Sequence, residues 1–176
     1  MELTRQLAIA SGVEVVHPTR ENILDFTFTP DGNFLDYTIS PPQSSHGVVN
    51  QIPVLGGVPR HLLEGVESAV SFSPDGSQMA YVRFDADTSE NLVMIAKADG
   101  TGVRKLISNR ASLAYGDFGV QWSPDGGRIA IVTSQIGPDG VNSSVKEVDV
   151  ATGVEFNLDS KMTVGGKYLL VIELRK

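Results

Sequence analysis

The sequence predicts an all-β protein built from repeated four-stranded units, and three observations carry this prediction. A turn of the form aromatic–Ser/Thr–Pro–Asp–Gly occurs three times, at residues 28–32, 72–76 and 122–126, with its glycines 44 and 50 residues apart. A second, glycine-rich turn alternates with the first and ends at Gly12, Gly57, Gly102 and Gly153, at separations of 45, 45 and 51 residues. Alternating apolar and polar residues flank both turns, as in half-buried strands. A period in this range is typical of repeat architectures.

The first type of turn has a simple mechanism. Proline presets the backbone, aspartate accepts hydrogen bonds from its own main chain, and glycine supplies a positive φ. The aspartates recur because the turn needs them, so they are not catalytic candidates. The sequence therefore assigns a structural role to the three copies, which comprise Pro30, Asp31, Gly32, Pro74, Asp75, Gly76, Pro124, Asp125 and Gly126. Residues 163–166 form an eroded fourth copy.

Four strands, here named a to d, make up each predicted unit. Strand a precedes the Pro-Asp-Gly turn and is expected at residues 24–28, 68–72 and 118–122. Strand b follows it, at 34–39, 78–84, 128–133 and 167–174. Strands c and d flank the glycine-rich turn, first at 3–9 and 13–16. The connections at 40–47, 85–90 and 135–142 (b to c) and at 19–22, 64–67 and 108–116 (d to a) are expected to be loops.

A four-stranded unit with a period of 40–50 residues is the signature of a β-propeller blade. One such sheet cannot bury both faces alone, whereas stacking against like neighbours buries them. We expect four blade equivalents, with the chain starting at strand c and ending after strand b. Residues 1–18 supply strands c and d of a split blade, 23–63, 67–107 and 117–158 form whole blades, and 160–176 supply strands a and b.

Three arrangements of the split blade remain open at this point. The two halves can pair within one chain and close a four-bladed ring, or pair between two chains in a homodimer that closes an eight-bladed ring. Alternatively, the chain is a piece of a longer protein. An isolated open arc is disfavoured because it leaves apolar sheet faces exposed at both ends.

Composition excludes several classes of function. The chain has 176 residues, a net charge of −7 and 14 Lys and Arg without a basic run, which argues against a nucleic acid partner. It has no cysteine, so a thiolate nucleophile, a disulfide and a Cys-based zinc site are excluded. No apolar run approaches the roughly 18 residues of a membrane helix, so no membrane insertion is expected. The N-terminus lacks the apolar core of a signal peptide.

The connecting loops form the candidate binding face, because loops on one face of a rigid scaffold commonly carry function. Its candidate residues are Glu21, His46, Glu67, Asp87, Glu90, Arg110, Tyr115, Asp117 and Asp139. Glu21, Glu67 and Asp117 each precede an inner strand, so they could converge at the channel mouth and hold a divalent cation or act as acid–base groups. Solvated loop charge is the favoured interpretation. No catalytic, cofactor or metal residue is assigned, since His17, His46 and His61 lack metal-ligand spacing.

Residues 72–82 and 98–106 resemble the WD40-like repeat of the TolB-type bacterial propellers, and the resemblance extends over essentially the whole chain. Similar repeats occur in periplasmic TolB, in gating propellers of prolyl-oligopeptidase-like enzymes and in sensory regions attached to bacterial serine/threonine kinases. Residues 51–60 look most like the kinase-attached type. The resemblance implies a propeller in an extracytoplasmic bacterial setting.

A repeat of this kind specifies a fold better than a function. The leading hypothesis is a non-enzymatic module that binds a protein or peptide or acts as a scaffold, as a sensory or regulatory region of a larger protein, without a cofactor. One alternative is an enzyme-associated role, either a gating propeller or a metal-dependent hydrolase at the channel mouth. The other is a self-assembling propeller fragment, natural or engineered, without a ligand.

Overall fold

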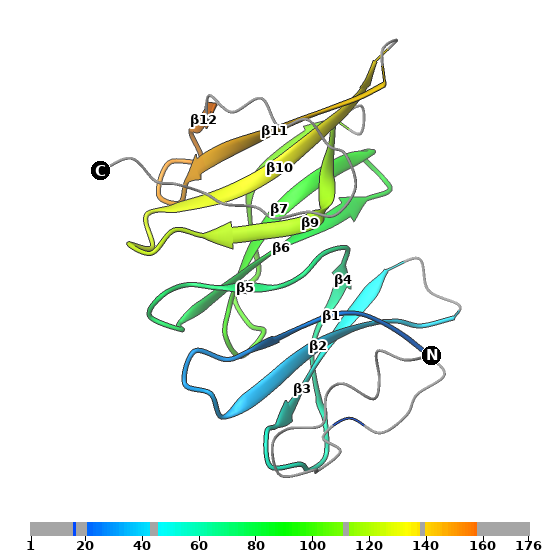
Figure 1. Cartoon of the computed structure of the whole chain (residues 1–176), viewed down its shortest axis with the longest axis vertical. Coiled ribbons are helices and arrows are strands. Elements are labelled where there is room, and N and C mark those ends of the chain that lie inside the picture. Colours follow the sequence, from blue (N-terminus) through cyan, green and yellow to red (C-terminus); the bar gives the residue numbers. More distant parts are fainter. Residues whose placement is uncertain (1–15, 17–20, 43–45, 111–112, 138–139, 158–176) are drawn as a thin grey trace.

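The computed structural model describes residues 16, 21–42, 46–110, 113–137 and 140–157, which form three antiparallel four-stranded sheets stacked in chain order (Figure 1). Blade 1 consists of β1 (Asn22–Phe28), β2 (Phe34–Ser40), β3 (Gly47–Pro53) and β4 (Arg60–Val66). Blade 2 consists of β5 (Ser71–Phe72), β6 (Gln78–Asp85), β7 (Glu90–Lys97) and β8 (Arg104–Arg110). Blade 3 consists of β9 (Leu113–Trp122), β10 (Arg128–Gly137), β11 (Gly140–Asp149) and β12 (Glu155–Asn157). The predicted all-β fold of propeller blades is confirmed.

Within each sheet, strands that are consecutive in sequence are hydrogen-bonded neighbours, so each blade is a simple meander. The split blade expected from residues 1–18 and 160–176 lies outside the described residues, except for Val16. The described part of the chain contains no helix long and apolar enough to cross a membrane.

The Pro-Asp-Gly turns are held by a repeated hydrogen-bond pattern. In blade 2 the Ser73 hydroxyl donates to Asp75 Oδ1 at 2.6 Å and accepts from the backbone N–H of Gln78 at 2.9 Å. Asp75 Oδ1 also accepts from the backbone N–H of Ser77 at 3.0 Å, and Gly76 has φ +71°. Thr29 and Asp31 in blade 1 and Ser123 and Asp125 in blade 3 make the same hydroxyl-to-carboxylate bond at 2.6 Å.

Strands occupy much of two connections that were expected to be loops, and β4 also continues to Val66, within the expected loop 64–67. β8 extends to Arg110 and β9 begins at Leu113, within the expected loop 108–116. β10 continues to Gly137 and β11 begins at Gly140, within the expected loop 135–142. In the second case, cross-strand hydroxyl pairs continue the ladder, because Thr133 bonds Ser144 at 2.8 Å and Ser134 bonds Ser143 at 2.9 Å. Polar composition alone suggested a loop there.

One expected strand is shorter than predicted. Strand a of blade 2 was expected at 68–72, but β5 spans only Ser71–Phe72. The Ser68 hydroxyl accepts the backbone N–H of Val82 at 2.9 Å and so replaces a main-chain partner. Such side-chain bonds compete with regular sheet pairing.

Apolar side chains at repeated positions bury the blades against one another. Blades 2 and 3 share a core of Ala80, Val82, Val93, Ile95, Ile107, Val120, Trp122, Ile129, Ile131 and Val148. Blades 1 and 2 share a core of Val49, Leu62, Leu63, Val66, Val70, Met79, Tyr81, Leu92, Met94 and Ala96. A third cluster covers the other face of blade 1 and contains Val16, Leu35, Tyr37, Ile39 and Ile52.

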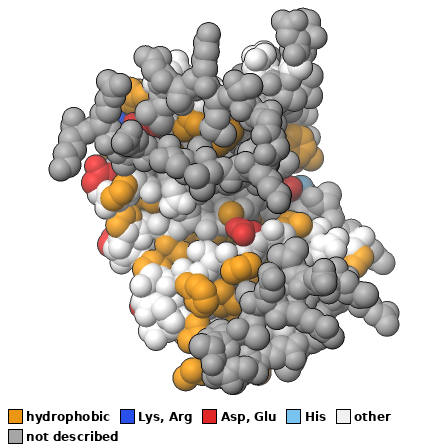
Figure 2. Space-filling view, in the orientation of Figure 1, with side chains coloured by type: hydrophobic (Ala, Val, Ile, Leu, Met, Phe, Trp, Pro, Cys, Tyr) orange, Lys and Arg blue, Asp and Glu red, His pale blue; other side chains and the backbone are white. Residues whose placement is uncertain are grey.

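That other face of blade 1 carries a row of exposed apolar side chains, which we call the β1 row: Leu24, Phe26 and Phe28, with exposures of 54%, 44% and 50%. Figure 2 shows hydrophobic side chains gathered over this blade. The equivalents of Phe26, Val70 in blade 2 and Val120 in blade 3, are only 6% and 5% exposed, because the preceding blade covers them. The β1 row therefore has the character of a blade-packing face.

Candidate functional site

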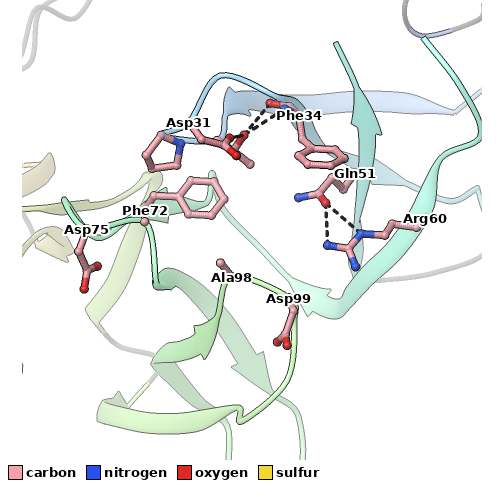
Figure 3. Close-up of a pocket in the computed structure, with 11 residues that line it drawn as sticks. Asp31, Phe34, Gln51, Arg60, Phe72, Asp75, Ala98 and Asp99 are labelled. Carbon is pink, nitrogen blue, oxygen red and sulfur yellow. Dashed lines mark hydrogen bonds between the residues drawn. The ribbon is translucent and has the colours of Figure 1, made fainter. Parts of the chain in front are cut away.

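A groove opens between blades 1 and 2 on the face that carries the hairpin turns (Figure 3). Its volume is about 420 Å³. The two Pro-Asp-Gly turns, β3, the start of β4 and the β7–β8 turn all contribute to it. The residues that line this interblade groove are Thr29, Pro30, Asp31, Phe34, Gln51, Arg60, Phe72, Asp75, Gly76, Ala98 and Asp99.

The walls of the groove combine two aromatic rings with charged groups. Phe34 at the start of β2 and Phe72 at the end of β5 are half-buried, and their rings lie on opposite sides of the space in Figure 3. Asp99 lies at the edge formed by the β7–β8 turn, and Arg60 lies beside Gln51 on the blade 1 side. A concave surface with aromatic walls on which polar groups converge is typical of ligand sites.

A row of three polar side chains supports the blade 1 side of the groove, and we call it the polar column: Asp36, Gln51 and Arg60. Gln51 Nε2 donates to Asp36 Oδ1 at 2.7 Å, and Arg60 donates to Gln51 Oε1 through Nε at 2.9 Å and Nη2 at 2.7 Å. Asp36 and Gln51 are 1% and 3% exposed. A buried amide is thus fixed by hydrogen bonds on both sides, as burial of polar groups requires.

Sheet register explains why these three residues meet. Asp36 on β2 lies opposite Gln51 on β3, and Gln51 lies opposite Arg60 on β4. Cross-strand neighbours in an antiparallel sheet point to the same face, so the three side chains form one row across blade 1. This row faces blade 2.

Burial raises the pKa of the Asp36 carboxyl to about 6, while the hydrogen bond from Gln51 and the charge of Arg60 act in the opposite direction. Desolvation is the dominant cause because it penalises the charged form. Asp36 Oδ2 is buried and accepts no hydrogen bond from the described residues.

The three carboxyls that line the groove behave in the opposite way. Side-chain hydrogen bonds from Thr29, Ser73 and Thr101 are the main cause that lowers the pKa values of Asp31, Asp75 and Asp99, respectively, with backbone N–H groups next. Hydrogen bonds to the charged form favour it. The groove therefore holds three ionised carboxylates and one guanidinium at neutral pH, a formal charge of −2 from the charged groups that line it.

The structure brings two of the predicted binding-face residues into contact. His46, just before β3, and Glu67, which follows β4, are joined by an Nδ1–Oε1 contact of 2.6 Å. This contact ties the β2–β3 connection to the segment that enters blade 2. Glu90 and Arg110 lie opposite each other in the β7–β8 register.

The remaining binding-face residues are dispersed. Glu21 lines a smaller pocket of about 210 Å³ with Val16, Tyr37, Ile39, Ile52, Gly57 and Pro59. Burial, and secondarily the charge of Glu21, raise the pKa of Tyr37. Asp87 donates its backbone N–H to Asp85 Oδ1 at 3.0 Å in the β6–β7 turn.

Three further candidates have no described side-chain contacts. Tyr115 and Asp117 belong to β9 rather than to a loop, which corrects their expected placement. The side chains of Tyr115, Asp117 and Arg110 lie outside the described part of the structure. Asp139 and His17 lie outside it entirely. Among the described residues no group of three His, Asp or Glu could hold a metal ion.

The groove itself was missed by the sequence analysis, although a signal for it exists. At the positions of Asp36 and Gln51, blade 2 carries Ala80 and Ile95. Polar residues on a blade face that is otherwise apolar mark a departure from the repeat. The turn residues Pro30, Asp31, Asp75 and Gly76 were assigned a structural role alone, yet they also line the groove.

Comparisons with known proteins agree with this architecture. No family model and no curated protein matches the sequence. Among solved structures, a TolB-type protein from Agrobacterium tumefaciens is 22% identical with a TM-score of 0.64 over 84% of this chain and 50% of that one. The β-propeller domain of the Trilobed protease from Pyrococcus furiosus is 16% identical with a TM-score of 0.56, over 78% of this chain and 43% of that one.

An acylaminoacyl peptidase from Pyrococcus horikoshii is 14% identical with a TM-score of 0.59, over 78% of this chain and 25% of that one. The chain thus spans half or less of the length of these structures. At such identities the likeness shows the β-propeller fold, shared with TolB and with peptidase propellers.

Proposed function

We propose that this chain is a non-enzymatic binding module that takes an extended segment of a protein partner in the interblade groove. The observation that carries the proposal is the groove itself, an open space of about 420 Å³ with aromatic walls. Its small residues Gly76 and Ala98 allow a main chain to approach, and its rigid turns hold the charged groups in place. In this proposal the module belongs to a larger bacterial protein in an extracytoplasmic setting, with the kinase-attached propellers as the model for a sensory role.

A selection experiment tests this proposal. The full chain is immobilised and challenged with a displayed library of random twelve-residue peptides. We expect enrichment of a family of related peptides that the Ala98→Trp variant no longer binds, because the indole fills the groove. Val54→Trp is the matched control, since Val54 holds the equivalent place in blade 1, where its backbone N–H donates to Asn33 just as that of Ala98 donates to Ser77. Absence of enriched peptides, or equal binding by the Ala98→Trp variant, would contradict the proposal.

The β1 row favours a second candidate, self-assembly. The β1 row consists of three exposed apolar side chains, and at the position of Phe26 blades 2 and 3 bury Val70 and Val120, so a blade of a second copy would fit this face. Light scattering after size exclusion separates the two candidates. Self-assembly as the main function predicts a discrete oligomer that Phe28→Asp dissociates, together with no enrichment of peptides.

The peptidase propellers among the structural neighbours support a third candidate, a gating role. This role requires a hydrolase domain in the same polypeptide. The coding sequence on either side of this chain decides it, because a kinase domain there would favour the sensory role and a hydrolase domain the gating role.

A further inference from the structure

We infer that the interblade groove selects a cationic side chain, Arg or Lys, from its peptide partner; this rests on the proposed function and specifies its ligand. The charges that line the groove are complementary to a basic side chain. Asp31, Asp75 and Asp99 line the groove, against the single cation Arg60. The chain as a whole also carries a net charge of −7, which attracts basic segments over a longer range.

Arg60 is already hydrogen-bonded within blade 1. Its Nε and Nη2 groups both donate to Gln51 Oε1, at 2.9 and 2.7 Å, and its charge acts on the buried carboxyl of Asp36. The guanidinium is therefore directed into the polar column, and Asp75 lies across the space from it in Figure 3. The charge of Lys97 acts on Asp99, and the excess negative charge of the groove is left to meet a cation from outside.

The groove also carries a pair of aromatic side chains. Phe34 and Phe72 present half-buried rings to the groove from opposite sides. The aliphatic stem of Lys or Arg packs well on such rings, and the face of an aromatic ring attracts a cation placed over it. Aromatic walls with carboxylates at the rim match a long side chain that is apolar along its stem and positive at its end.

The interface between blades 2 and 3 lacks this combination of groups. The residue equivalent to Phe34 is Gln78, and the residue equivalent to Gln51 is Ile95, which is only 1% exposed. Trp122, the equivalent of Phe72, is buried in the core between blades 2 and 3. The combination of two half-buried rings with three carboxylates thus belongs to blades 1 and 2.

The test uses the library selection described above, followed by titration of a labelled enriched peptide by fluorescence anisotropy. We expect Arg or Lys at one fixed position of the enriched family. Asp99→Asn is expected to weaken binding about fivefold, as loss of one exposed ion pair does, and added salt to weaken wild-type binding further. Asparagine keeps an acceptor for the backbone N–H and hydroxyl of Thr101, which Asp99 Oδ1 bonds at 2.9 and 2.6 Å, so the turn is retained.

Asp149→Asn is the matched control. Asp149 Oδ1 accepts the backbone N–H and hydroxyl of Thr152 at 2.8 Å in the equivalent turn of blade 3, and Asp149 does not line the groove. Its substitution is expected to leave the affinity unchanged. Enriched peptides without a basic residue, or equal affinity of the Asp99→Asn and wild-type proteins, would overturn the inference while the proposed function stands. A selection that enriches no peptide overturns the proposed function itself.

Discussion

The two blade–blade interfaces bury the same repeat positions with different chemistry. Between blades 1 and 2, the row across the sheet is Asp36, Gln51 and Arg60, a hydrogen-bonded polar column. Between blades 2 and 3, the equivalent row is Ala80, Ile95 and Arg104, whose first two members belong to the apolar core. The polar interface opens into a groove, whereas Ile95 is buried beneath blade 3. A repeat protein can therefore place a candidate site by changing one row of one blade.

Blade 3 offers a third version of this row. Ala130 lies opposite Glu147, and Glu147 lies opposite Phe156. Glu147 is paired with Arg128 at 2.5 Å, and the Arg128 guanidinium lies 5.2 Å from the centroid of the Phe156 ring. Phe156 is 44% exposed, and no described blade follows it. Of the three described blades, only blade 1 combines a buried carboxyl with a buried amide in this row.

The largest expected effect comes from making the apolar interface resemble the polar one. Ile95→Gln places an amide opposite Ala80, where no carboxyl can accept its hydrogen bond. Loss of the buried side chain together with burial of an incompletely paired amide is expected to lower the free energy of unfolding by about 4 kcal/mol. Urea denaturation of the full chain measures it.

Val103→Gln is the control for this change, because Val103 is 41% exposed and belongs to no core cluster. Its effect is expected to stay within about 0.5 kcal/mol. If Ile95→Gln is equally mild, the interface between blades 2 and 3 does not depend on apolar packing, and the comparison fails.

The next effect concerns the pH dependence that Asp36 gives to the polar interface. Its pKa in the folded chain, about 6, is raised above the ordinary value of 3.8. As the pH rises, Asp36 therefore loses its proton at a lower pH in the unfolded chain than in the folded chain. The contribution of Asp36 to the free energy of unfolding is fully present below about pH 4 and is lost as the pH rises through 6. A shift of this size corresponds to about 3 kcal/mol at most.

Asp36→Asn isolates this contribution, because asparagine keeps the acceptor for Gln51 but has no charge to desolvate. Relative to wild type, we expect the variant to gain up to about 3 kcal/mol in free energy of unfolding between pH 4 and pH 7. Urea titrations at pH 4, 5, 6 and 7 measure the difference, in which the other carboxyls cancel. A difference that is constant over this range would show that Asp36 titrates normally.

How far the sequence predicted the molecule depends on whether a feature repeats. Residues that recur at fixed spacing specified the blades, since Phe72, Pro74, Asp75 and Gly76 have counterparts in the turns at residues 28–32 and 122–126. The turn, the strand pairing and the inward apolar positions follow from local chemistry that recurs in each repeat. The predicted strand limits were wrong where hydroxyl side chains, such as those of Ser68 and Ser143, make hydrogen bonds to a neighbouring strand.

The candidate site lay where repetition fails. Loop composition drew attention to residues such as His46 and Glu67, and the structure does pair these two. The groove, however, depends on side chains from β2, β3, β4 and β5, together with the β7–β8 turn, and their convergence follows from sheet register and blade stacking. Sequence spacing alone does not give these distances. The visible sign was a non-repeated carboxyl and amide, Asp36 and Gln51, at positions that blade 2 fills with Ala80 and Ile95.

The smallest effect separates the two equivalent arginines. Arg60 and Arg104 both begin the fourth strand of their blade, but only Arg60 has a buried carboxyl in its row. Arg60→Met is expected to raise the pKa of Asp36 further, because the charge that opposes desolvation is lost. Since Arg60 is largely exposed, its loss is expected to lower the free energy of unfolding by only about 1 kcal/mol at pH 7, and by less at pH 5, where Asp36 is protonated in the folded chain. Arg104→Met should change stability equally little at both pH values. Urea titrations of both variants at pH 5 and pH 7 measure these changes in the free energy of unfolding. If Arg104→Met loses as much stability as Arg60→Met, with the same pH dependence, the two interfaces differ in packing but not in electrostatics.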